Sequence, residues 1–391
     1  VSAERPKPDG YRTLPHIWYD VPVPNANVEA PGRTGYATYT LEVTNVPPDE
    51  LAIFSQPQGL AATWYAVTSS RVTLLAEQGM IGTSQEGYIP WERRLFSVMP
   101  DRDKSSITLV LHVANHDHQR GGAWYPPRMG LGNHIYDEAV NKSHRSFLLM
   151  GICLIMGLYH LGLYIQRRRD KGSLFFAILC LDMFIREQCT ERMLEQFVAT
   201  PNEPLYMLRY MTEYETMYLG LPIFLMFFHE IYPKWFPTRL IRASILLTSF
   251  WVLQPLVLSM IDFSRFNLNF QYIIVGTIVF VIVQLARLMI RGDQIAKELV
   301  VAMFVIIVCI AHDILISRSL IAGSFILTYG IVCLILAQSH ILSKRFSQAF
   351  ETNQTLSEEL ALKSKNLEVE LTARRQLEGE ISEMEGRLNR A

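Results

Sequence analysis

Aromatic and polar side chains occur together in residues 1–134 in a combination that suits sugar binding. The large aromatic residues of this segment include Trp18, Trp64, Tyr65, Tyr88, Trp91, Trp124 and Tyr125. Aromatic faces can stack on sugar rings, and the neighbouring Glu92, Arg93 and His116 can hydrogen-bond hydroxyl groups. The alternative is that most of these rings belong to the core of the domain. The candidate ligand-binding residues are Trp64, Tyr65, Tyr88, Trp91, Glu92, Arg93, His116 and Trp124.

No motif in the sequence predicts a catalytic or metal site. His116-Asp117-His118 has the spacing of a metal half-site, but it precedes Gly121-Gly122 and is more typical of a loop. Asp101-Arg102-Asp103 is interrupted by a cation, which does not suit calcium. Glycoside hydrolysis needs two positioned carboxylates, and kinases and cyclases carry signatures that this sequence lacks. We expect no catalytic residue, no metal and no cofactor, so these residues alone do not form an enzyme.

Ionisable residues inside long apolar segments form a second set of candidates. They are Asp182, Arg209, Glu213, Glu215, His312 and Asp313. A charge in the hydrocarbon of a membrane is costly and therefore marks a functional candidate. All six are expected in the middle or outer part of their segments, where Arg209 could pair with a carboxylate. Two interpretations stay open: a polar pocket that opens toward the front domain, or a structural network that fixes the packing of the helices.

Seven apolar segments would position these ionisable residues. They are Ser146–Ile165, Ser173–Phe184, Leu205–Phe228, Leu240–Met260, Leu268–Ile290, Leu299–Ile316 and Ile321–Leu342. Most are close to the ~20 residues that a helix needs to cross ~30 Å of hydrocarbon. They do not alternate as the strands of a membrane barrel would. The sequence therefore predicts a bundle of seven transmembrane helices over residues 146–343.

Basic residues predict the orientation of this bundle. The loops after the first, third, fifth and seventh segments are the more basic ones, as in Arg167-Arg168-Arg169 and Lys344-Arg345. The positive-inside rule then places the N-terminus outside and the C-terminus in the cytoplasm. The sequence starts at Val1, so export would need a signal that has been removed. All five cysteines lie beyond residue 145, which is commoner for a bacterial periplasmic domain than for an animal ectodomain.

Short alternating segments predict that the front domain is a β sandwich. Ala37–Val46 and Ser106–Ala114 alternate apolar with polar or small residues, and Ala61–Thr68 and Arg71–Ala76 flank a turn at Ser69-Ser70. Strands of this period and spacing favour an antiparallel sandwich of jelly-roll type. The predicted domains are a periplasmic jelly roll (1–134), a linker (135–145), the membrane bundle (146–343) and a cytoplasmic coiled coil (344–391).

The C-terminal segment has heptad spacing that predicts a parallel coiled-coil homodimer. The predicted interface residues are Phe346, Asn353, Leu356, Leu360, Leu367, Leu377, Ile381, Met384 and Leu388. A single asparagine at an a position, here Asn353, favours a parallel dimer in register. The alternative is a single solvated helix. Basic residues do not gather between aromatic residues, so we expect no binding of nucleic acid.

Several stretches of the chain resemble one family of bacterial receptors. They are Gly35–Tyr39, Trp64-Tyr65, His112–Asn115, Gly121-Gly122 and Gly130–Gly132 in the front domain, with Arg209-Tyr210, Pro222, Phe228, Ile231–Pro233, Ala337-Gln338 and Phe346 beyond it. The front domain looks like a galactose-binding-type jelly roll. The whole layout is similar to bacterial seven-transmembrane receptors with diverse intracellular signalling modules, most of all to hybrid sensor kinases of the RetS and LadS kind.

The resemblance implies a multi-pass receptor in the bacterial inner membrane. Its periplasmic ligand would be a carbohydrate or another small molecule, and its output domain would follow Ala391. That domain would be a histidine kinase of a two-component system, or alternatively a diguanylate cyclase. The implied partners are the ligand, membrane lipids, a second copy of the chain and another sensor kinase. The alternative function is that of a channel or transporter with an extracellular regulatory domain.

Overall fold

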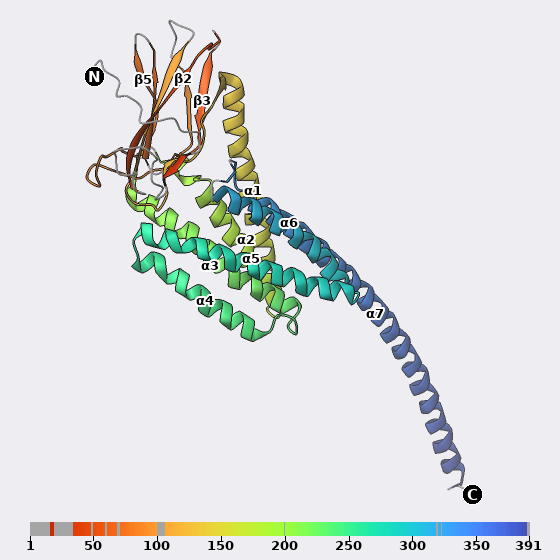
Figure 1. The fold of residues 1–391 in the computed structure, drawn as a ribbon. Helices are drawn as coiled ribbons and strands as arrows, with labels where there is room; N and C mark the ends of the chain where they lie inside the picture. The colour runs from red at the N-terminus through yellow and green to blue at the C-terminus, as the bar shows by residue number, and fades with distance from the viewer. Residues whose placement is uncertain are drawn as a thin grey trace. The chain divides into compact units, whose positions relative to one another are not determined.

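The computed structural model describes residues 16–18, 34–47, 50–58, 61–68, 71–99, 106–198, 200–317, 320–321 and 323–388. The predicted turn at Ser69-Ser70 and the Asp101–Asp103 stretch lie outside these residues. The chain divides into two units, Val1–Leu334 and Ile335–Ala391. The first unit contains all the strands and six complete helices (Figure 1).

The described residues of the N-terminal region form nine strands, and every pairing among these strands is antiparallel. They are β1 (His16–Trp18), β2 (Gly35–Val43), β3 (Leu51–Ser55), β4 (Ala61–Val67), β5 (Val72–Gln78), β6 (Leu95–Val98), β7 (Ile107–Asn115), β8 (Gly121–Ala123) and β9 (Arg128–Leu131). They form a four-stranded sheet in the order β2-β7-β4-β5, a three-stranded sheet in the order β6-β3-β9, and the pair β1-β8. The four predicted strands are thereby confirmed within a few residues at each end.

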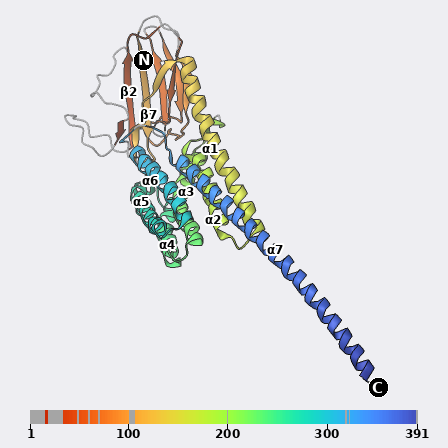
Figure 2. The same ribbon diagram turned by 90° about the vertical axis from the view of Figure 1, so that its right-hand side faces the viewer.

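Strand β7 shows why this region folds as sheets. Ile107, Leu109, Leu111 and Val113 are buried, while the residues between them are half-buried on the opposite face. A period of two places one set of side chains in the core and the other outside it. β2 runs alongside β7 over its whole length, with Gly35 opposite Asn115 and Val43 opposite Ile107 (Figure 2).

One apolar core lies between the two larger sheets. Ile53 of β3 and Leu95 of β6 come from the three-stranded sheet and pack in the same cluster as Trp64 of β4 and Leu109 of β7. Ala62 and Ala66 stand two residues before and after Trp64 on β4 and leave room for its indole ring. The two sheets are therefore layers of one folded region.

The described residues beyond Leu131 form seven α-helices. They are α1 (Gly132–Gln166), α2 (Lys171–Thr190), α3 (Glu203–Ile231), α4 (Thr238–Val257), α5 (Met260–Ile290), α6 (Gln294–Ser317) and α7 (Leu327–Leu388), with a short 3-10 helix, η1 (Leu194–Gln196), after α2. The side chains of Asp170, Asn202 and Ser259 accept hydrogen bonds from backbone N–H groups at the starts of α2, α3 and α5. Such caps fix where a helix begins because its first N–H groups have no partner within the helix.

The helices confirm the predicted apolar segments, but several begin or end at other residues. Helix α2 continues beyond Phe184 to Thr190, and α5 begins at Met260 rather than at Leu268. The last helix begins at Leu327 rather than at Ile321. The first begins at Gly132, directly after β9, so residues 135–145, predicted as a linker, are helical. Ile135 explains this early start because its side chain packs with Ala52 and Phe54 of β3. Packing against the sheet thus extends α1 beyond its apolar membrane segment.

Five of the helices in the described part of the chain are long and apolar enough to cross a membrane. They are α1, α4, α5, α6 and the first part of α7. The helices α2 and α3 are long enough but carry ionisable residues such as Asp182, Arg186 and Arg209. These two helices therefore need partners for their charges, and the partners define the site described below.

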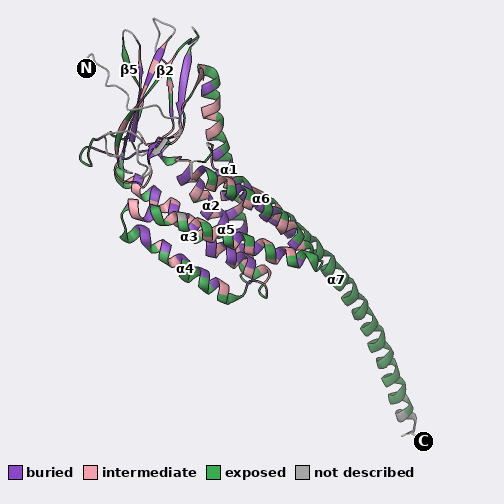
Figure 3. Cartoon of the chain, viewed as in Figure 1, coloured by how far each residue is buried: buried purple, intermediate pink, exposed green. Residues whose placement is uncertain are grey.

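Beyond residue 345, α7 is a single helix with exposed side chains (Figure 3). The predicted apolar interface residues from Phe346 to Met384 are exposed in one copy, including Leu356 at 51% and Leu360 at 59%. The side chain of Leu388, one of these predicted interface residues, lies outside the described residues. The homodimer itself stays a prediction.

Candidate functional site

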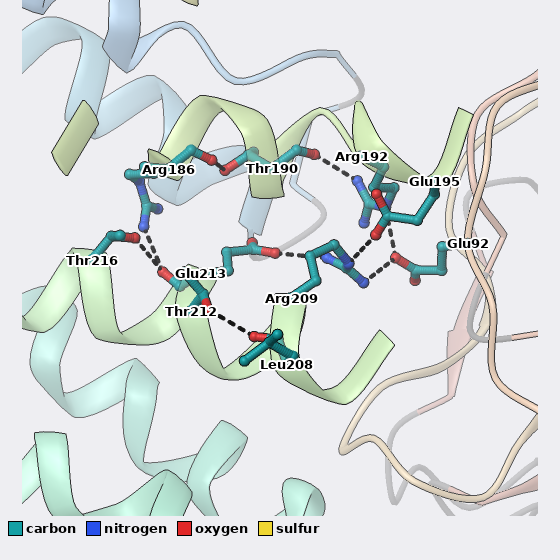
Figure 4. A network of polar contacts seen from close by, with 10 residues as sticks. All are labelled: Glu92, Arg186, Thr190, Arg192, Glu195, Leu208, Arg209, Thr212, Glu213 and Thr216. Carbon is teal, nitrogen blue, oxygen red and sulfur yellow. Dashed lines mark hydrogen bonds and ion pairs between the residues drawn. The ribbon is translucent and has the colours of Figure 1, made fainter. Parts of the chain in front are cut away.

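A cluster of buried ion pairs joins the sheets to the helices. Glu92, in the loop between β5 and β6, is fully buried. Its carboxylate oxygen Oε2 lies 2.6 Å from Nε of Arg192, which follows α2, and 3.1 Å from a terminal nitrogen of Arg209 on α3 (Figure 4). One carboxylate of the sheet region therefore holds two arginines of the helical region, about 100 residues later in the sequence.

Arg209 is the residue with the most contacts in this cluster. Its Nε lies 2.6 Å from Glu195 of η1, and a terminal nitrogen donates a 2.9 Å hydrogen bond to Glu213 one turn along α3. The guanidinium also lies 4.4 Å from the centre of the Tyr210 ring, a cation–π distance. A buried charge without a partner costs several kcal/mol, so these contacts keep Arg209 charged and fixed in place.

Arg192 reaches the cluster because the chain turns sharply after α2. Its φ is +54°, the left-handed conformation that ends many helices. The side chain donates to Glu92 and to the backbone carbonyl of Thr190 at 2.8 Å. Burial lowers the pKa of Arg192, but the carboxylates of Glu92 and Glu213 outweigh that effect and raise its pKa above the usual value. The guanidinium is therefore charged at neutral pH.

Aromatic side chains surround the ion pairs. Tyr206, Tyr210, Tyr214 and Tyr218 follow one another at four-residue spacing along α3, and the centres of successive rings lie 5.1, 6.0 and 6.3 Å apart. Residues at this spacing lie on one face of a helix. Tyr88 and Trp91 of the sheet region pack in the same buried cluster as these rings. The contact between the sheets and α3 is thus apolar around a charged centre.

Next to this cluster lies a cavity of about 270 Å³ between the helices. Its lining comes from α2, α3, α5, α6, the start of α7 and the loop residues 118–125. Charged members of the lining include Asp182, Arg186, Glu213 and Asp313. Most of the remaining lining is apolar, with leucine, isoleucine, methionine and phenylalanine side chains. A mostly apolar cavity with a few polar groups is typical of a small-molecule site.

His118 lies where the loop residues meet α3. Its ring is 5.5 Å from Tyr210 and 5.4 Å from Trp124. Burial, and after it the charges of Arg120, Arg209 and Arg192, together lower the pKa of His118 to about 3. The imidazole is therefore neutral at physiological pH and is part of the packing of this junction.

The comparison with known families identifies the membrane region. Residues 145–345 match the family described as 7TM diverse intracellular signalling. This match covers slightly more than half of the 391 residues. The chain belongs to this family. No curated protein matches the sequence.

Membership of the 7TM diverse intracellular signalling family makes the chain a multi-pass membrane protein with a module associated with signalling. The match runs from α1 into α7 and includes α2 and α3. The ion-pair cluster and the cavity therefore lie largely within the signalling module. Glu92, which comes from the sheets, is the member of the cluster that lies outside it.

The structure distributes the eight predicted ligand-binding residues over several places. Trp64 lies in the core of the sheets, Tyr88 and Trp91 pack against α3, and Glu92 belongs to the ion-pair cluster. The ring of Tyr65 stands edge-on to His112, and Arg93 donates to the carbonyl of Glu77. His116 contacts Tyr88, and Trp124 lies under the Arg120 guanidinium in the cavity lining. Their role in ligand binding stays a prediction.

Most of the six predicted intramembrane residues meet around the cluster and the cavity. Arg209 and Glu213 form an ion pair, and Asp182, Glu213 and Asp313 line the cavity. His312 lies 3.1 Å from Asp313. Glu215 lies on α3 outside the described lining of the cavity. Whether this network signals or only fixes the packing stays open.

Sequence reasoning missed Arg192, Glu195 and Arg186. Charges of both signs follow closely between residues 186 and 195, at the end of a segment that is otherwise apolar. Opposite charges that alternate over so short a distance indicate pairing within the protein. That signal pointed to a network at this end of α2, but it could not identify Glu92 as the partner from the sheets.

Proposed function

We propose that this chain is a signal receptor in which the sheets bind a ligand and the helices transmit the change to the C-terminal helix. The observation that carries this proposal is the contact of Glu92 with both Arg192 and Arg209. It joins the region proposed to bind the ligand directly to the two helices of the membrane module that carry the most charge.

A buried cluster of this kind suits a relay because moving one charged residue away from its partners is costly, so its members are expected to change position together. Withdrawing Glu92 from both arginines would leave its buried carboxylate without a cation and Arg192 without a carboxylate, which costs several kcal/mol. Intermediate positions are therefore disfavoured relative to two arrangements that each satisfy the charges. A ligand that prefers one arrangement by a few kcal/mol is enough to shift the population.

The proposed ligand is a carbohydrate or another small molecule, and the proposed fold of the sheets is a jelly roll. Two antiparallel sheets around one core support this fold. Of the eight candidate residues, Tyr65, Arg93, His116 and Trp124 are half-buried and the other four are buried, so a sugar would reach the first four most directly. The proposed orientation has the sheets in the periplasm and the C-terminus in the cytoplasm of a bacterium, with α2 and α3 completing seven membrane spans.

The proposed output is dimeric. The exposed apolar side chains along the C-terminal part of α7, such as Leu360 and Leu367, suit a parallel coiled coil with a second copy. In the likeness of hybrid sensor kinases of the RetS and LadS kind, this coil would control a histidine kinase, with a diguanylate cyclase as the alternative. The residues of this chain would supply no catalysis, and another sensor kinase would be a further partner.

Disulfide cross-linking of the full chain in lipid nanodiscs tests both the dimer and the relay. Asn353→Cys places thiols face to face in a parallel dimer in register, whereas Thr355→Cys places them on the outer side of the coil. We expect rapid cross-linking of the first variant and slow cross-linking of the second. Glu92→Gln should then change the cross-linking rate of Asn353→Cys several-fold, whereas Glu42→Gln, on an exposed position of β2, should not.

Equal rates for the two thiol positions would refute the dimer. A rate that is the same in the Glu92→Gln and Glu42→Gln backgrounds would refute the relay through Glu92. Flux of ions or solutes through the reconstituted chain would instead favour a channel or transporter.

A further inference from the structure

Two charges of opposite sign face the cavity from adjacent turns of α2. Asp182 and Arg186 are four residues apart, which places them on one face of the helix, and both line the cavity. They do not form an ion pair with each other within 4 Å. Each could therefore interact with a group inside the cavity.

The other acidic groups in the lining already have partners. Glu213 accepts from Arg209 at 2.9 Å, and Glu187 accepts from Thr328 at 2.5 Å. Asp313 accepts two hydrogen bonds, from the backbone N–H groups of Ile326 and Leu327, at 2.8 and 2.9 Å. Glu187 and Asp313 connect α2 and α6 to the start of α7, and Glu213 pairs within α3, so all three carboxylates already have partners.

Asp182 differs from them. Its exposure is only 8%, yet among the described residues no side chain or backbone group hydrogen-bonds it or pairs with it. A buried carboxylate without a partner is costly and is a functional candidate inside a membrane. Gly220 of α3 stands opposite it, and a Cβ at that position would lie 3.3 Å from Oδ2 of Asp182. The glycine leaves the space that the carboxylate occupies.

Arg186 is held in place without a direct ion pair among the residues that the structure describes. Its guanidinium donates a 3.0 Å hydrogen bond to the backbone carbonyl of Glu213 (Figure 4). No described carboxylate lies within 4 Å of it. The contact with the carbonyl orients the guanidinium, and its remaining N–H groups can donate to an anion.

We propose that the cavity binds a zwitterionic small molecule with an apolar body, and that apolar α-amino acids are the simplest members of this class. The ammonium group would contact Asp182 and the carboxylate would contact Arg186, one helical turn away. The apolar side chain would lie among residues such as Met217, Leu221 and Ile274, which also line the cavity. A volume of about 270 Å³ is large enough to hold a molecule of that size.

This inference rests on the proposed receptor function, since it adds a ligand site within the signalling module. The two charges explain why a molecule with both signs is favoured over one with a single charge. An amine alone would leave Arg186 without an anion, and a carboxylate alone would leave Asp182 without a cation. Either loss removes a charge-assisted hydrogen bond, which corresponds to a roughly tenfold to hundredfold loss of affinity.

Binding of radiolabelled leucine to the full chain in nanodiscs tests the proposal. We expect saturable binding that isoamylamine and isocaproate, which carry only one of the two charges, displace at least tenfold less well than leucine does. Alanine, which lacks three carbons of the apolar body, should bind about sixtyfold more weakly, at about fourfold per carbon.

Matched variants locate the site. Asp182→Asn and Arg186→Gln should each lower leucine affinity at least tenfold, whereas the same exchanges at exposed positions, Asp137→Asn and Arg287→Gln, should leave it unchanged. Gly220→Ala keeps both charges and should still weaken binding, because the added methyl group crowds the Asp182 carboxylate. Gly220→Ala therefore tests the site even where Asp182→Asn or Arg186→Gln prevents folding.

Three results would overturn the inference: no saturable binding of leucine, equal displacement by either single-charge analogue, or equal affinity in Asp182→Asn and Asp137→Asn. None of them bears on the relay, since the cross-linking rate of Asn353→Cys is measured without an amino acid. Conversely, an unchanged cross-linking rate in Glu92→Gln would refute the relay but would not affect the measurement of leucine binding.

Discussion

Replacement of Glu92 by glutamine gives the most direct measure of the coupling between the sheets and the helices. The substitution keeps the shape of the side chain and removes its charge. Arg209 would retain Glu195 and Glu213 as partners. Arg192 would retain the carbonyl of Thr190 but lose the carboxylate that lies 2.6 Å away. A buried charge that loses its partner destabilises a protein by about 3–5 kcal/mol, so we expect this loss for Glu92→Gln.

Replacement of Arg192 by glutamine should lower the free energy of unfolding by less than Glu92→Gln does. In Arg192→Gln the carboxylate of Glu92 keeps Arg209 at 3.1 Å, so no charge is left alone, and we expect a loss of about 1–3 kcal/mol. In the double variant the charge that was left alone is also removed. Its destabilisation should therefore fall short of the sum of the two single losses by about 1–3 kcal/mol, the coupling expected of residues in direct contact.

Urea unfolding of the full chain in bicelles, followed by tryptophan fluorescence, measures these free energies. Trp64 and Trp91 are buried in or beside the sheets and report on this region. Glu42→Gln serves as the matched control and should stay within about 0.5 kcal/mol of the unsubstituted chain. The reasoning is refuted if Glu92→Gln costs no more than this control, or if the two single losses simply add.

Two further predictions concern the sheet region. The pKa of His118 is lowered to about 3, first by burial and then by nearby arginines, so the folded state cannot bind the proton that an unfolded histidine takes up below its ordinary value of 6.5. The free energy of unfolding should therefore fall as the pH drops from about 6.5 toward 3, by about 2 kcal/mol between pH 7 and pH 5. The variant His118→Gln should lose this pH dependence, whereas His134→Gln should keep it. Gly79 has a φ of +67°, and a Cβ atom added to it by substitution would lie 2.4 Å from the carbonyl oxygen of Ile89. Gly87 has a φ of +81°, and no atom lies within 4 Å of the place where its Cβ would be. Gly79→Ala should therefore cost more than about 3 kcal/mol and Gly87→Ala about 1–2 kcal/mol, and equal losses in urea unfolding would contradict this explanation.

The regular elements could be predicted from the sequence because each leaves a local pattern. Alternation over Ser106–Ala114 identified the central strand, and long, mainly apolar segments identified the seven helices. The limits of the helices were less predictable. Residues 135–145 are polar, and they are helical because Ile135 meets Phe54 on a strand some eighty positions earlier, a contact that no local pattern records.

The candidate site was predictable only in part, for the same physical reason. A charge within an apolar segment, such as Arg209 or Asp182, stands out against its neighbours. Glu92 does not, because it lies among aromatic and basic residues that suit a sugar site equally well. Its role as a partner of Arg192 depends on a contact across the fold. Sequence reasoning therefore found Arg209 and Glu213 on α3, missed Arg192 and Glu195, and assigned Glu92 to a sugar-binding site.

The direct connection of β9 to α1 bears on how the helix is rotated relative to the sheets. Leu131 ends the strand and Gly132 begins the helix, so no flexible residue separates a sheet from a helix of 35 residues that enters the membrane. An α-helix turns by about 100° per residue. Inserting one residue after Gly132 would turn the membrane segment of α1 by that angle relative to the sheets, and inserting seven would nearly restore the original direction. Receptors altered in this way would show whether orientation, rather than distance, is what the first helix passes on.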